Sequence, residues 1–529
     1  MRRVALAVLL LLAASPASAL AAPSERLVVL MHRDAGTTPQ AVAARASGPR
    51  APQIGMVTVT PRPGESTAQA ARRLRADPAV ASVQPEGRMR LRYLPNDPAL
   101  SSPELAPRTP GGTVQEWWAS PMGLPAAWDV TRGDGALVAI IDTGADGGHP
   151  ELSGKIRDTL DLDETFGAGP PTTDENGHGT HVASLACAQA NNGVGIAGAG
   201  LNCGLLIIKS DLTDSSVAEG IVEAVDRGAD AVNMSFGSDS GQGSAALRRA
   251  VDYAVARGVV LVAAAADQPT AEQGYPSNVL QPTGTGAKLG QGRGLSVTAA
   301  SADGTRASFA GYGSQISLAA YGSYGADSGP AGLLGAFPMG QTEQESGDRP
   351  CRCRTAMGDD TRYAYLEGTS MAAPLVTAVA ALVHHLNPDL PVRDSLRILK
   401  QTAHRPAGTG WTPDLGWGIV DAGAAVNAAK ALDRTKPTSR LRITRRDARR
   451  VTVAVTGRDR SPAGVVSSGI ARYEIWRATP GRAARKVGST TSGPVTVAVP
   501  GGRGSFFSIA VDRQGNREIA PSRPDARVR

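Results

Sequence analysis

The chain has 529 residues, of which 41% are hydrophobic and 19% are charged, and its formal net charge is +7. This composition is globular and excludes a disordered chain, and the length predicts two or three domains instead of one. The charge is uneven, because residues 433–529 contain 21 Lys or Arg and only 7 Asp or Glu.

The basic C-terminal segment raises the question of a nucleic-acid partner. It contains no recognisable nucleic-acid-binding motif, so we predict no nucleic-acid binding. Two interpretations of its charge stay open. One is attachment to an anionic polymer of a wall or surface, and the other is a basic surface that is only solvated.

The first 22 residues, "MRRVALAVLLLLAASPASALAA", combine two arginines, an apolar run too short to span a bilayer, and small residues in an A-x-A pattern at Ala17–Ala19. This pattern predicts a signal peptide over residues 1–22, cut between Ala19 and Ala22. An N-terminal membrane anchor is the alternative, which the A-x-A ending disfavours. No later stretch is apolar enough to predict a membrane helix, so we expect an exported, extracellular protein.

The chain has four cysteines, Cys187, Cys203, Cys351 and Cys353. Export permits disulfides, and four cysteines allow three pairings between which the sequence does not decide. No His or further Cys lies close to the Cys351-x-Cys353 pair, so disulfides or free thiols are favoured over a zinc site.

Residues 23–94 are predicted to form a small α+β domain. The segments "RLVVLMH" and "GMVTVTP" are extended, and a helix opened by Ser66 runs through "STAQAARRLRA", where Ala and Leu recur with helical spacing. The segment "DPAVASVQPEG" then turns and leads into another extended piece.

Residues 95–432 alternate apolar strands with helical segments. The strands are "ALVAIIDTG", "GLLIIKS", "ADAVNMSFG", "VVLVAAAAD" and "GLSVTAAS", separated by helical runs such as "SSVAEGIVEAVDRG" and "GSAALRRAVDYAVARG". Continuous apolar strands with helices between them predict an α/β domain, a mainly parallel sheet with helices on both faces. Residues 322–364, rich in Gly, Asp and Pro, are predicted to be a surface insertion.

Residues 433–529 contain four short segments that alternate apolar and polar residues, "RRVTVAVTG", "IARYEIWRA", "PVTVAVP" and "SFFSIAVD". Alternation with turns between the segments predicts a small antiparallel, sandwich-like β domain.

Three polar residues stand where parallel sheets gather their ligands, beyond the carboxyl ends of strands. Asp142 follows "LVAII", His178 lies in "NGHGTHVASLA" at the start of a helix, and Ser370 lies in "LEGTSMAAP". We expect Pro374 in the opening turn of the helix that follows Ser370. Together an acid, an imidazole and a hydroxyl make a serine nucleophilic, because the histidine takes its proton and the acid stabilises the imidazolium.

The segments "VAIIDTGADGGHPEL", "GHGTHVA" and "GTSMAAP" resemble the three active-site blocks of the subtilisin-like serine proteases, the subtilases, in the order Asp, His, Ser. The resemblance covers nearly all of residues 95–432. It implies that Asp142, His178 and Ser370 form a catalytic triad that hydrolyses peptide bonds through an acyl-enzyme intermediate, without a cofactor for the chemistry.

Two further segments resemble parts of this family. "NMSFGS" is similar to the segment that lines the substrate cleft, which implies that Ser235, Phe236 and Gly237 pair with the main chain of a peptide. "ANNGVGIAGAG" is similar to a loop that often carries calcium in the family, which implies structural calcium, although the loop itself lacks an obvious carboxylate.

The flanking domains also have counterparts among the subtilases. Residues 23–94 are similar to the inhibitory propeptide that such an enzyme removes from itself, and "PNDPAL" resembles a mature N-terminal stretch, so cleavage is expected near Tyr93–Asn96. Residues 433–529 resemble the immunoglobulin-like or fibronectin-like modules of exported bacterial enzymes. For that module a spacer without a ligand and a binding role are both open.

One residue departs from the family pattern. The strand that resembles "VVLVAAAAD" ends in Gly-Asn in the family, where the Asn amide donates to the oxyanion of the tetrahedral intermediate, but this chain has Ala266 and Asp267. An ionised carboxylate only accepts hydrogen bonds. Asp267 can therefore replace the amide only when it is protonated, a state that burial and nearby negative charge favour. Some proprotein-processing subtilases resemble this chain in carrying Asp here.

Three interpretations of function follow. The first is an active secreted serine endopeptidase with an optimum at lower pH or a narrowed specificity. The second, from a different class, is a protease-like protein with vestigial catalysis that acts mainly as a binding module. In the third, the strand is slightly misaligned and a residue other than Asp267 donates to the oxyanion.

Overall fold

The computed structural model describes residues 26–528 except 33–45, 87–92, 106–108, 164–168, 239–240, 326–331, 349, 389, 407, 433, 448, 461–468, 480–481, 500–502 and 513–515. The predicted signal peptide lies outside the described residues. Residues 92–432 form one compact unit, and residues 1–91 together with 433–529 form the other.

The N-terminal part of the chain is an antiparallel four-stranded sheet. Its strand order is β2 (Ala46–Ala51), β3 (Met56–Val59), β1 (Leu27–Met31) and β4 (Val80–Pro85). The helix α2 (Thr67–Arg75) buries Ala70, Ala71 and Leu74 in the same core as the sheet. A capping box starts the helix, because the Ser66 hydroxyl accepts from Gln69 N while the Gln69 side chain accepts from Ser66 N.

Residues 92–432 are built on a seven-stranded parallel sheet with the order β11-β10-β9-β8-β5-β7-β6. The strands are β5 (Leu137–Asp142), β6 (Ile156–Leu162), β7 (Gly204–Ser210), β8 (Ala231–Met234), β9 (Val260–Ala264), β10 (Leu295–Ala300) and β11 (Leu318–Tyr321). Every residue of the strands β7 to β10 is buried. Continuous apolar sequences predict this burial when both faces of a sheet are covered.

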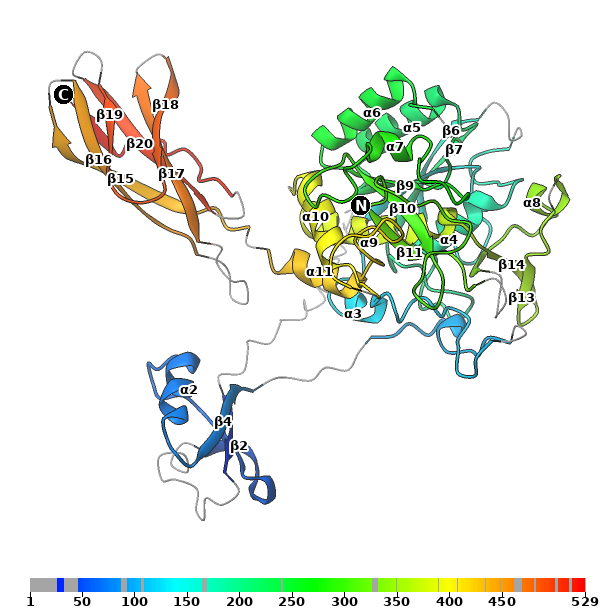
Figure 1. The fold of residues 1–529 in the computed structure, drawn as a ribbon, viewed down its shortest axis with the longest axis horizontal. Coiled ribbons are helices and arrows are strands. Elements are labelled where there is room, and N and C mark those ends of the chain that lie inside the picture. The colour runs from blue at the N-terminus through cyan, green and yellow to red at the C-terminus, as the bar shows by residue number, and fades with distance from the viewer. Residues whose placement is uncertain are drawn as a thin grey trace, which may run out of the picture. The chain divides into compact units, whose positions relative to one another are not determined.

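Helices cover both faces of this sheet (Figure 1). The helices of this unit are α3 (Leu124–Trp128), α4 (His178–Cys187), α5 (Asp214–Asp226), α6 (Ala245–Ala256), α7 (Ser277–Leu280), α8 (Glu343–Ser346), α9 (Thr369–Leu386), α10 (Val392–Thr402) and α11 (Ala422–Lys430), of which α8 buries no residue. One buried cluster joins α4, α9 and α11 to one face, and a second cluster joins α5 and α6 to the other. The predicted α/β architecture is therefore confirmed.

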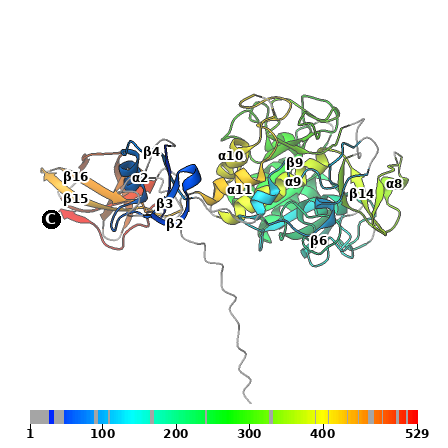
Figure 2. The ribbon, with the colours of Figure 1, turned by 90° about the horizontal axis from the view of Figure 1, so that it is seen from below.

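The helix α9 runs through the interior of this unit (Figure 2). By length and composition alone it could cross a membrane, since its mean hydropathy is 1.4, but 83% of it is buried inside the protein. The sequence-based expectation that no later stretch is apolar enough for a membrane helix was therefore wrong for α9. Its apolar character comes from its place in the core, where a helix is covered on all sides.

The predicted surface insertion, residues 322–364, is only partly a surface segment. Within it lies a small antiparallel sheet in the order β12 (Leu333–Ala336), β14 (Asp360–Leu366) and β13 (Arg354–Met357). All of β12 is buried, as are Phe337 and Tyr363. The prediction was wrong for these residues, because composition averaged over the segment concealed two short apolar runs, of which β12 packs against α4.

The four cysteines form two disulfides in the structure. Cys187 at the end of α4 pairs with Cys203, next to the start of β7, and Cys351 pairs with Cys353 before β13. The pairing that the sequence left open is thus one bridge within the buried core and one at the base of a hairpin.

The C-terminal part consists of two antiparallel sheets. One has the order β15 (Thr438–Arg446), β16 (Arg450–Arg458) and β19 (Val495–Ala498), and the other has the order β18 (Arg482–Thr490), β17 (Ile470–Thr479), β20 (Gly504–Asp512) and β21 (Ala526–Val528). Side chains of both sheets share one buried cluster, including Val453, Ile475 and Phe506. The antiparallel β prediction is confirmed, while the resemblance to an immunoglobulin-like module stays a prediction.

Candidate active site

A buried carboxylate and an imidazole meet at the carboxyl end of β5. Asp142 is the last residue of β5 and is 2% exposed, and His178 is the first residue of α4. The distance between His178 Nδ1 and Asp142 Oδ1 is 2.8 Å. Since a carboxylate only accepts, His178 Nδ1 carries the proton, and Nε2 is left as the basic nitrogen.

A second buried acid, Asp174, fixes the start of α4. It accepts from the hydroxyl of Thr143 (2.8 Å), the amide of Gly177 (2.9 Å), and both the amide (2.7 Å) and the hydroxyl (2.6 Å) of Thr180. Burial raises the pKa of Asp174 even though these donors oppose the shift. Sequence reasoning missed this residue, although an acid just before a Gly-rich helix start is a recognisable capping signal.

Ser370 and Ser235 bond each other in both directions. The hydroxyl of Ser370 donates to the carbonyl of Ser235 (2.8 Å), and the hydroxyl of Ser235 donates to the carbonyl of Ser370 (2.7 Å). Pro374 explains the second bond, because an N–H at this position would otherwise bond the carbonyl four residues earlier, that of Ser370. The helix begins at Thr369, so the expectation of Pro374 in its opening turn was wrong, and Pro374 lies in the second turn.

The Ser235 hydroxyl is held by a buried chain of polar side chains. Thr377 Oγ1 donates to Asn233 Oδ1 (2.9 Å), and Asn233 Nδ2 donates to Ser235 Oγ (2.9 Å). Asn233 and Thr377 are fully buried, where an unmade hydrogen bond is costly. An asparagine inside the otherwise apolar strand β8 was the sequence signal that could have revealed this chain.

Asp267 lies beside Ser370, three residues beyond β9. Its Oδ1 accepts from the backbone N–H of Thr369 (2.7 Å). A Cβ built on Gly368 would lie 3.2 Å from Asp267 Oδ2 and 3.5 Å from Ser370 N, so these two atoms border the same small space. The Ser370 N–H makes no hydrogen bond within the described residues, as befits the first turn of a helix.

Burial and charge couple the titration of Asp267 and His178. Desolvation of its carboxyl group raises the pKa of Asp267, although the residue as a whole is exposed at the mouth of a pocket, and the Thr369 N–H and the His178 charge oppose the shift. Burial by itself lowers the pKa of His178, but the charges of Asp142, Asp174 and Asp267 outweigh it and raise that pKa.

A pocket of about 450 Å³ opens next to Ser370. Its lining includes Phe236, Gly237, Ala265 and Asp267, together with Ser370 itself. Of the three residues predicted to pair with a peptide, Phe236 and Gly237 line this pocket, and Ser235 instead bonds the backbone of Ser370.

Comparison with known proteins identifies the family. The profile of the subtilase family matches residues 133–418. Thermitase from Thermoactinomyces vulgaris is 31% identical over 326 residues, which cover 60% of this chain and 94% of thermitase. A thermophilic serine proteinase from a Bacillus species is 30% identical over 347 residues, covering 64% of this chain and 71% of the relative.

A solved structure gives the same result. A protease from Pseudoalteromonas arctica aligns with a TM-score of 0.50 and 29% identity, over 63% of this chain and 99% of that protease. The chain belongs to the subtilase family. It is a subtilisin-like serine endopeptidase.

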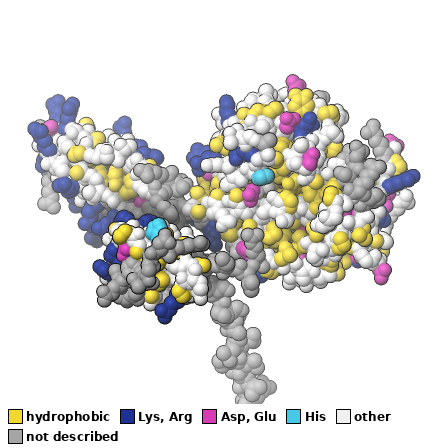
Figure 3. Space-filling model, turned by 60° about the horizontal axis from the view of Figure 1, so that its bottom comes forward, with side chains coloured by type: hydrophobic (Ala, Val, Ile, Leu, Met, Phe, Trp, Pro, Cys, Tyr) yellow, Lys and Arg dark blue, Asp and Glu magenta, His cyan; other side chains and the backbone are white. Residues whose placement is uncertain are grey.

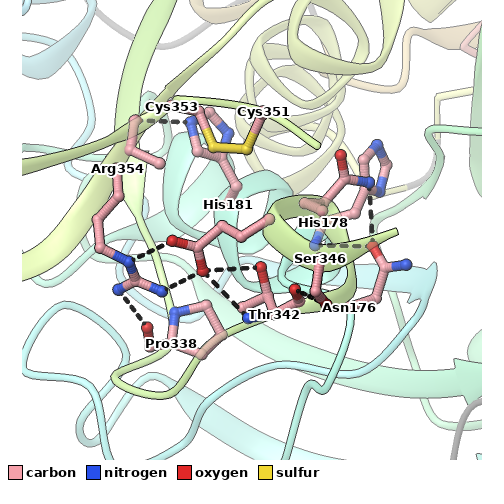
Figure 4. Close-up of a disulfide and its surroundings, with 12 residues drawn as sticks. Asn176, His178, His181, Pro338, Thr342, Ser346, Cys351, Cys353 and Arg354 are labelled. Carbon is pink, nitrogen blue, oxygen red and sulfur yellow. Dashed lines mark hydrogen bonds and ion pairs between the residues drawn. A yellow bond between two sulfur atoms is a disulfide. The ribbon is translucent and has the colours of Figure 1, made fainter. Parts of the chain in front are cut away.

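In this subtilase, the partly buried insertion contacts the loop that carries His178. Asn176 Oδ1 accepts from the amide of His178 (3.3 Å) and from Gln344 Nε2 (3.2 Å), and Asn176 Nδ2 donates to Glu343 Oε2 (3.0 Å). The amide of Cys351 donates to the carbonyl of Gln344 (2.8 Å), which connects the Cys351–Cys353 disulfide to α8 (Figure 4). The insertion therefore braces the residues that precede the imidazole.

The loop that resembles a calcium site is surrounded by carboxylates from other segments. Asp97 accepts from Asn191 N (2.7 Å), Glu116 from Ala197 N (2.9 Å), and Glu151 from Ile196 N (2.8 Å) and the hydroxyl of Tyr363 (2.9 Å). Burial raises the pKa of all three acids, that of Glu151 to about 8.

Each of these carboxylates accepts a backbone N–H of this loop. Across the described part of the chain, no group of three His, Cys, Asp or Glu side chains is placed to hold a metal ion. Structural calcium stays a prediction of the sequence.

The charge on Asp142 should control the protonation of His178. We expect Asp142→Asn to lower the pKa of His178, because the largest attraction for its proton is lost while burial remains. A histidine NMR titration in a Ser370→Ala background, which prevents self-digestion, measures the shift. Asp146→Asn, close by but not bonded to the imidazole, is the matched control, and an unchanged His178 pKa in Asp142→Asn would contradict the electrostatic assignment.

Proposed function

We propose that this subtilase hydrolyses peptide bonds through the triad Asp142, His178 and Ser370 by way of an acyl-enzyme intermediate. The observation that carries the proposal is the bond of 2.8 Å between buried Asp142 and His178 Nδ1, at the sheet edge where Ser370 lies in the first turn of α9 beside a pocket. The acid holds the imidazole in the tautomer whose Nε2 can accept a proton.

The chemistry begins when the Ser370 hydroxyl turns from the Ser235 carbonyl towards His178 Nε2. Ser370 Oγ then forms a bond to the carbonyl carbon of the peptide while His178 takes the hydroxyl proton. The resulting imidazolium gives this proton to the leaving amine as the C–N bond breaks. Water attacks the acyl-enzyme by the same route, and His178 returns the proton to Ser370 Oγ.

Asp267 in its protonated form is proposed to stabilise the oxyanion together with the Ser370 N–H. Its Oδ1 is occupied by the Thr369 N–H, which is the role that the oxygen of an asparagine amide would take. Oδ2 would then stand where the amide nitrogen would be, bordering the space beside Gly368 that Ser370 N also borders. A proton on Oδ2 would make that atom a donor to the oxyanion.

The chain Thr377–Asn233–Ser235 is proposed to position the nucleophile. Pro374 leaves the carbonyl of Ser370 without its helical partner, and the Ser235 hydroxyl occupies that carbonyl instead (2.7 Å). Asn233 and Thr377 fix the direction of the Ser235 hydroxyl. Without them the first turn of α9 would be free to shift relative to His178.

Export and self-processing complete the proposal. The N-terminal pattern of residues 1–22 and a relative from Xanthomonas campestris named an extracellular protease support secretion. Residues 23–94 would act as the inhibitory propeptide, removed near Tyr93–Asn96. The alternative of a binding module with vestigial catalysis is disfavoured, because the Asp142–His178 bond, the Ser370 backbone bond and the pocket are all preserved.

Removal of the proposed nucleophile should abolish both peptide hydrolysis and removal of the propeptide. We expect Ser370→Ala to lower kcat on the order of 10⁶-fold, because no acyl-enzyme can form, and to leave the propeptide attached in the secreted protein. Mass spectrometry of the secreted chain and a peptide hydrolysis assay measure both effects. Ser235→Ala, which keeps the nucleophile, is the comparison, and a Ser370→Ala protein that still sheds its propeptide would mean that another protease processes it.

The pH profile should report the proton on Asp267. Activity requires neutral His178, which is gained as pH rises through its pKa, and protonated Asp267, which is lost as pH rises through its own pKa, so we expect a bell-shaped profile of kcat. Asp267→Asn should abolish the alkaline limb and raise kcat on the order of 10²-fold at pH 8. The same change should move the acid limb to lower pH, because the Asp267 charge raises the pKa of His178.

The control for this change is Asp303→Asn, which removes one carboxylate of an exposed turn in the same unit. Its profile should match that of the wild type. If Asp267→Asn keeps the alkaline limb, Asp267 is not the group that titrates there, and another residue donates to the oxyanion.

Loss of the hydrogen bonds that join Thr377, Asn233 and Ser235 should change kcat more than KM. We expect Asn233→Ala to lower kcat about 10- to 100-fold with little change in KM, because displacement of a nucleophile slows the reaction without removing substrate contacts. Steady-state kinetics on a peptide substrate and the thermal unfolding midpoint are measured together. Asn202→Ala, at a partly exposed position outside this chain of hydrogen bonds, is the matched control. A loss of kcat no larger than in that variant would show that Asn233 has no positioning role.

A further inference from the structure

The outward face of the sheet β15-β16-β19 carries a group of exposed arginines. Leu441 on β15 and Val451 and Val453 on β16 are buried, so the residues that alternate with them face outward. The exposed residues of these two strands include the five that we call the arginine face, namely Arg440, Arg442, Arg445, Arg450 and Arg458.

Strand pairing sets the layout of this face. Arg440 lies opposite Thr456 and Arg442 opposite Ala454, and a bulge after Ile443 brings Arg445 opposite Thr452. Arg440 and Arg442 therefore project about 7 Å apart along one strand, from two steps of an extended chain. On β16, the residues opposite these arginines are the small side chains Thr452, Ala454 and Thr456.

The carboxylates close to this group lie outside its three strands. Glu518 accepts from the amide of Ser439 (2.7 Å) and Asp525 from the amide of Leu441 (3.1 Å), both on β15. The three strands contain six arginines and no Asp or Glu. Asp447, in the turn between β15 and β16, accepts from the backbone N–H groups of Arg449 and Arg450, and the charges of Arg450 and Arg445 help to lower its pKa. In the part of the chain that the structure describes, none of the five side chains of the arginine face forms an ion pair.

The excess of positive charge is visible on the surface. Figure 3 shows more Lys and Arg side chains than Asp and Glu across the surface of the C-terminal strands. Among the described residues, none of Asp447, Glu518 and Asp525 forms an ion pair with the five guanidinium groups, so the arginine face presents these groups to solvent.

In the second sheet of the C-terminal part, several cations are paired with one buried carboxylate. Glu474 on β17 is 6% exposed and contacts Lys486 Nζ at 3.0 Å, Arg517 Nη2 at 2.6 Å and Arg472 Nε at 3.7 Å. Burial opposes ionisation of Glu474, but hydrogen bonds from Lys486 and Trp476 and the nearby cations lower its pKa. One sheet therefore balances these positive charges internally, and the other presents its arginines to solvent.

We propose that the arginine face binds an extended, unbranched polymer of phosphate groups on the cell surface. Guanidinium groups bind phosphate oxygens in pairs and stay charged at any physiological pH. A row of arginines on a flat strand suits successive phosphates of a flexible chain. This binding is independent of the proposed peptidase chemistry, and it would hold the enzyme near its site of release.

The composition of the face argues against other partners. Its described residues include no aromatic side chain on which bases could stack and no helix that could enter the major groove of a duplex. Among the described residues of these three strands, none is an exposed large apolar residue of the kind a membrane-binding surface presents. The polymer backbone is therefore recognised through its charge alone.

The test uses the full chain in a Ser370→Ala background, with immobilised poly(glycerol phosphate) as the probe. The triple change Arg440→Gln, Arg442→Gln and Arg445→Gln is expected to weaken binding at least about tenfold at about 0.15 M salt. It should also reduce the slope of log Kd against log salt by about 2 to 3, because three phosphate contacts and their released counterions are lost.

The matched control removes three exposed arginines outside the face, Arg485→Gln, Arg503→Gln and Arg523→Gln. It carries the same net charge, and its affinity should stay within about threefold of the parent. Equal weakening of both variants would overturn the proposal in favour of non-specific charge attraction. Tighter binding of a single-stranded oligonucleotide with the same number of phosphates would overturn the choice of partner. Equal thermal midpoints of the variants show that the domain stays folded.

Discussion

The active-site geometry depends on a hydrogen bond that a helix cannot make. Pro374 deprives the carbonyl of Ser370 of its normal partner in α9, and Ser235 at the end of β8 supplies a replacement at 2.7 Å. Because this bond joins a strand to a helix, the position of Ser370 follows the position of the sheet. Asp142 lies at the same edge, on the neighbouring strand β5. The sheet therefore sets the positions of both the proposed acid and the proposed nucleophile.

Around this edge, buried acids determine how the site titrates. Asp142 holds the imidazole directly, and Asp174 builds the loop from which His178 projects. Each carboxylate raises the pKa of His178, against the opposing effect of burial. Asp267 takes part in the same balance, since its proton and the proton of His178 influence one another. An amide at position 267 would break this coupling, which gives the departure from the family pattern a physical consequence.

Charged side chains are arranged differently around the candidate active site and on the C-terminal sheets. Around the candidate active site, Asp142, Asp174 and Asp267 each accept a specific hydrogen bond, and the first two are buried. On the C-terminal sheets, arginines are numerous, and the described ion pairs gather around Glu474. Sequence-level charge counts could not distinguish these cases, because the pairing of a cation depends on which face of which strand it occupies.

The tertiary structure and the sequence contributed different things. The sequence by itself determined the architecture and the triad candidates, because continuous apolar runs predicted a parallel sheet covered on both faces, and local motifs around Asp142, His178 and Ser370 carried the resemblance to subtilases. These features are local, since burial periodicity and motif spacing are written in neighbouring residues. The strands β6 and β11 escaped notice, and β6 lacks a continuous apolar run because it is only partly buried.

Only the tertiary structure decided what joins distant segments. The bond between Ser235 and Ser370, the support from Asn233 and Thr377, and the contact of Asp267 with Thr369 connect residues more than about 100 positions apart. The burial of β12 within the insertion belongs to the same class, because it depends on packing against α4. Contacts of this kind arise from packing of whole elements, which fixes atoms to within a hydrogen-bond length and leaves no local pattern in the sequence.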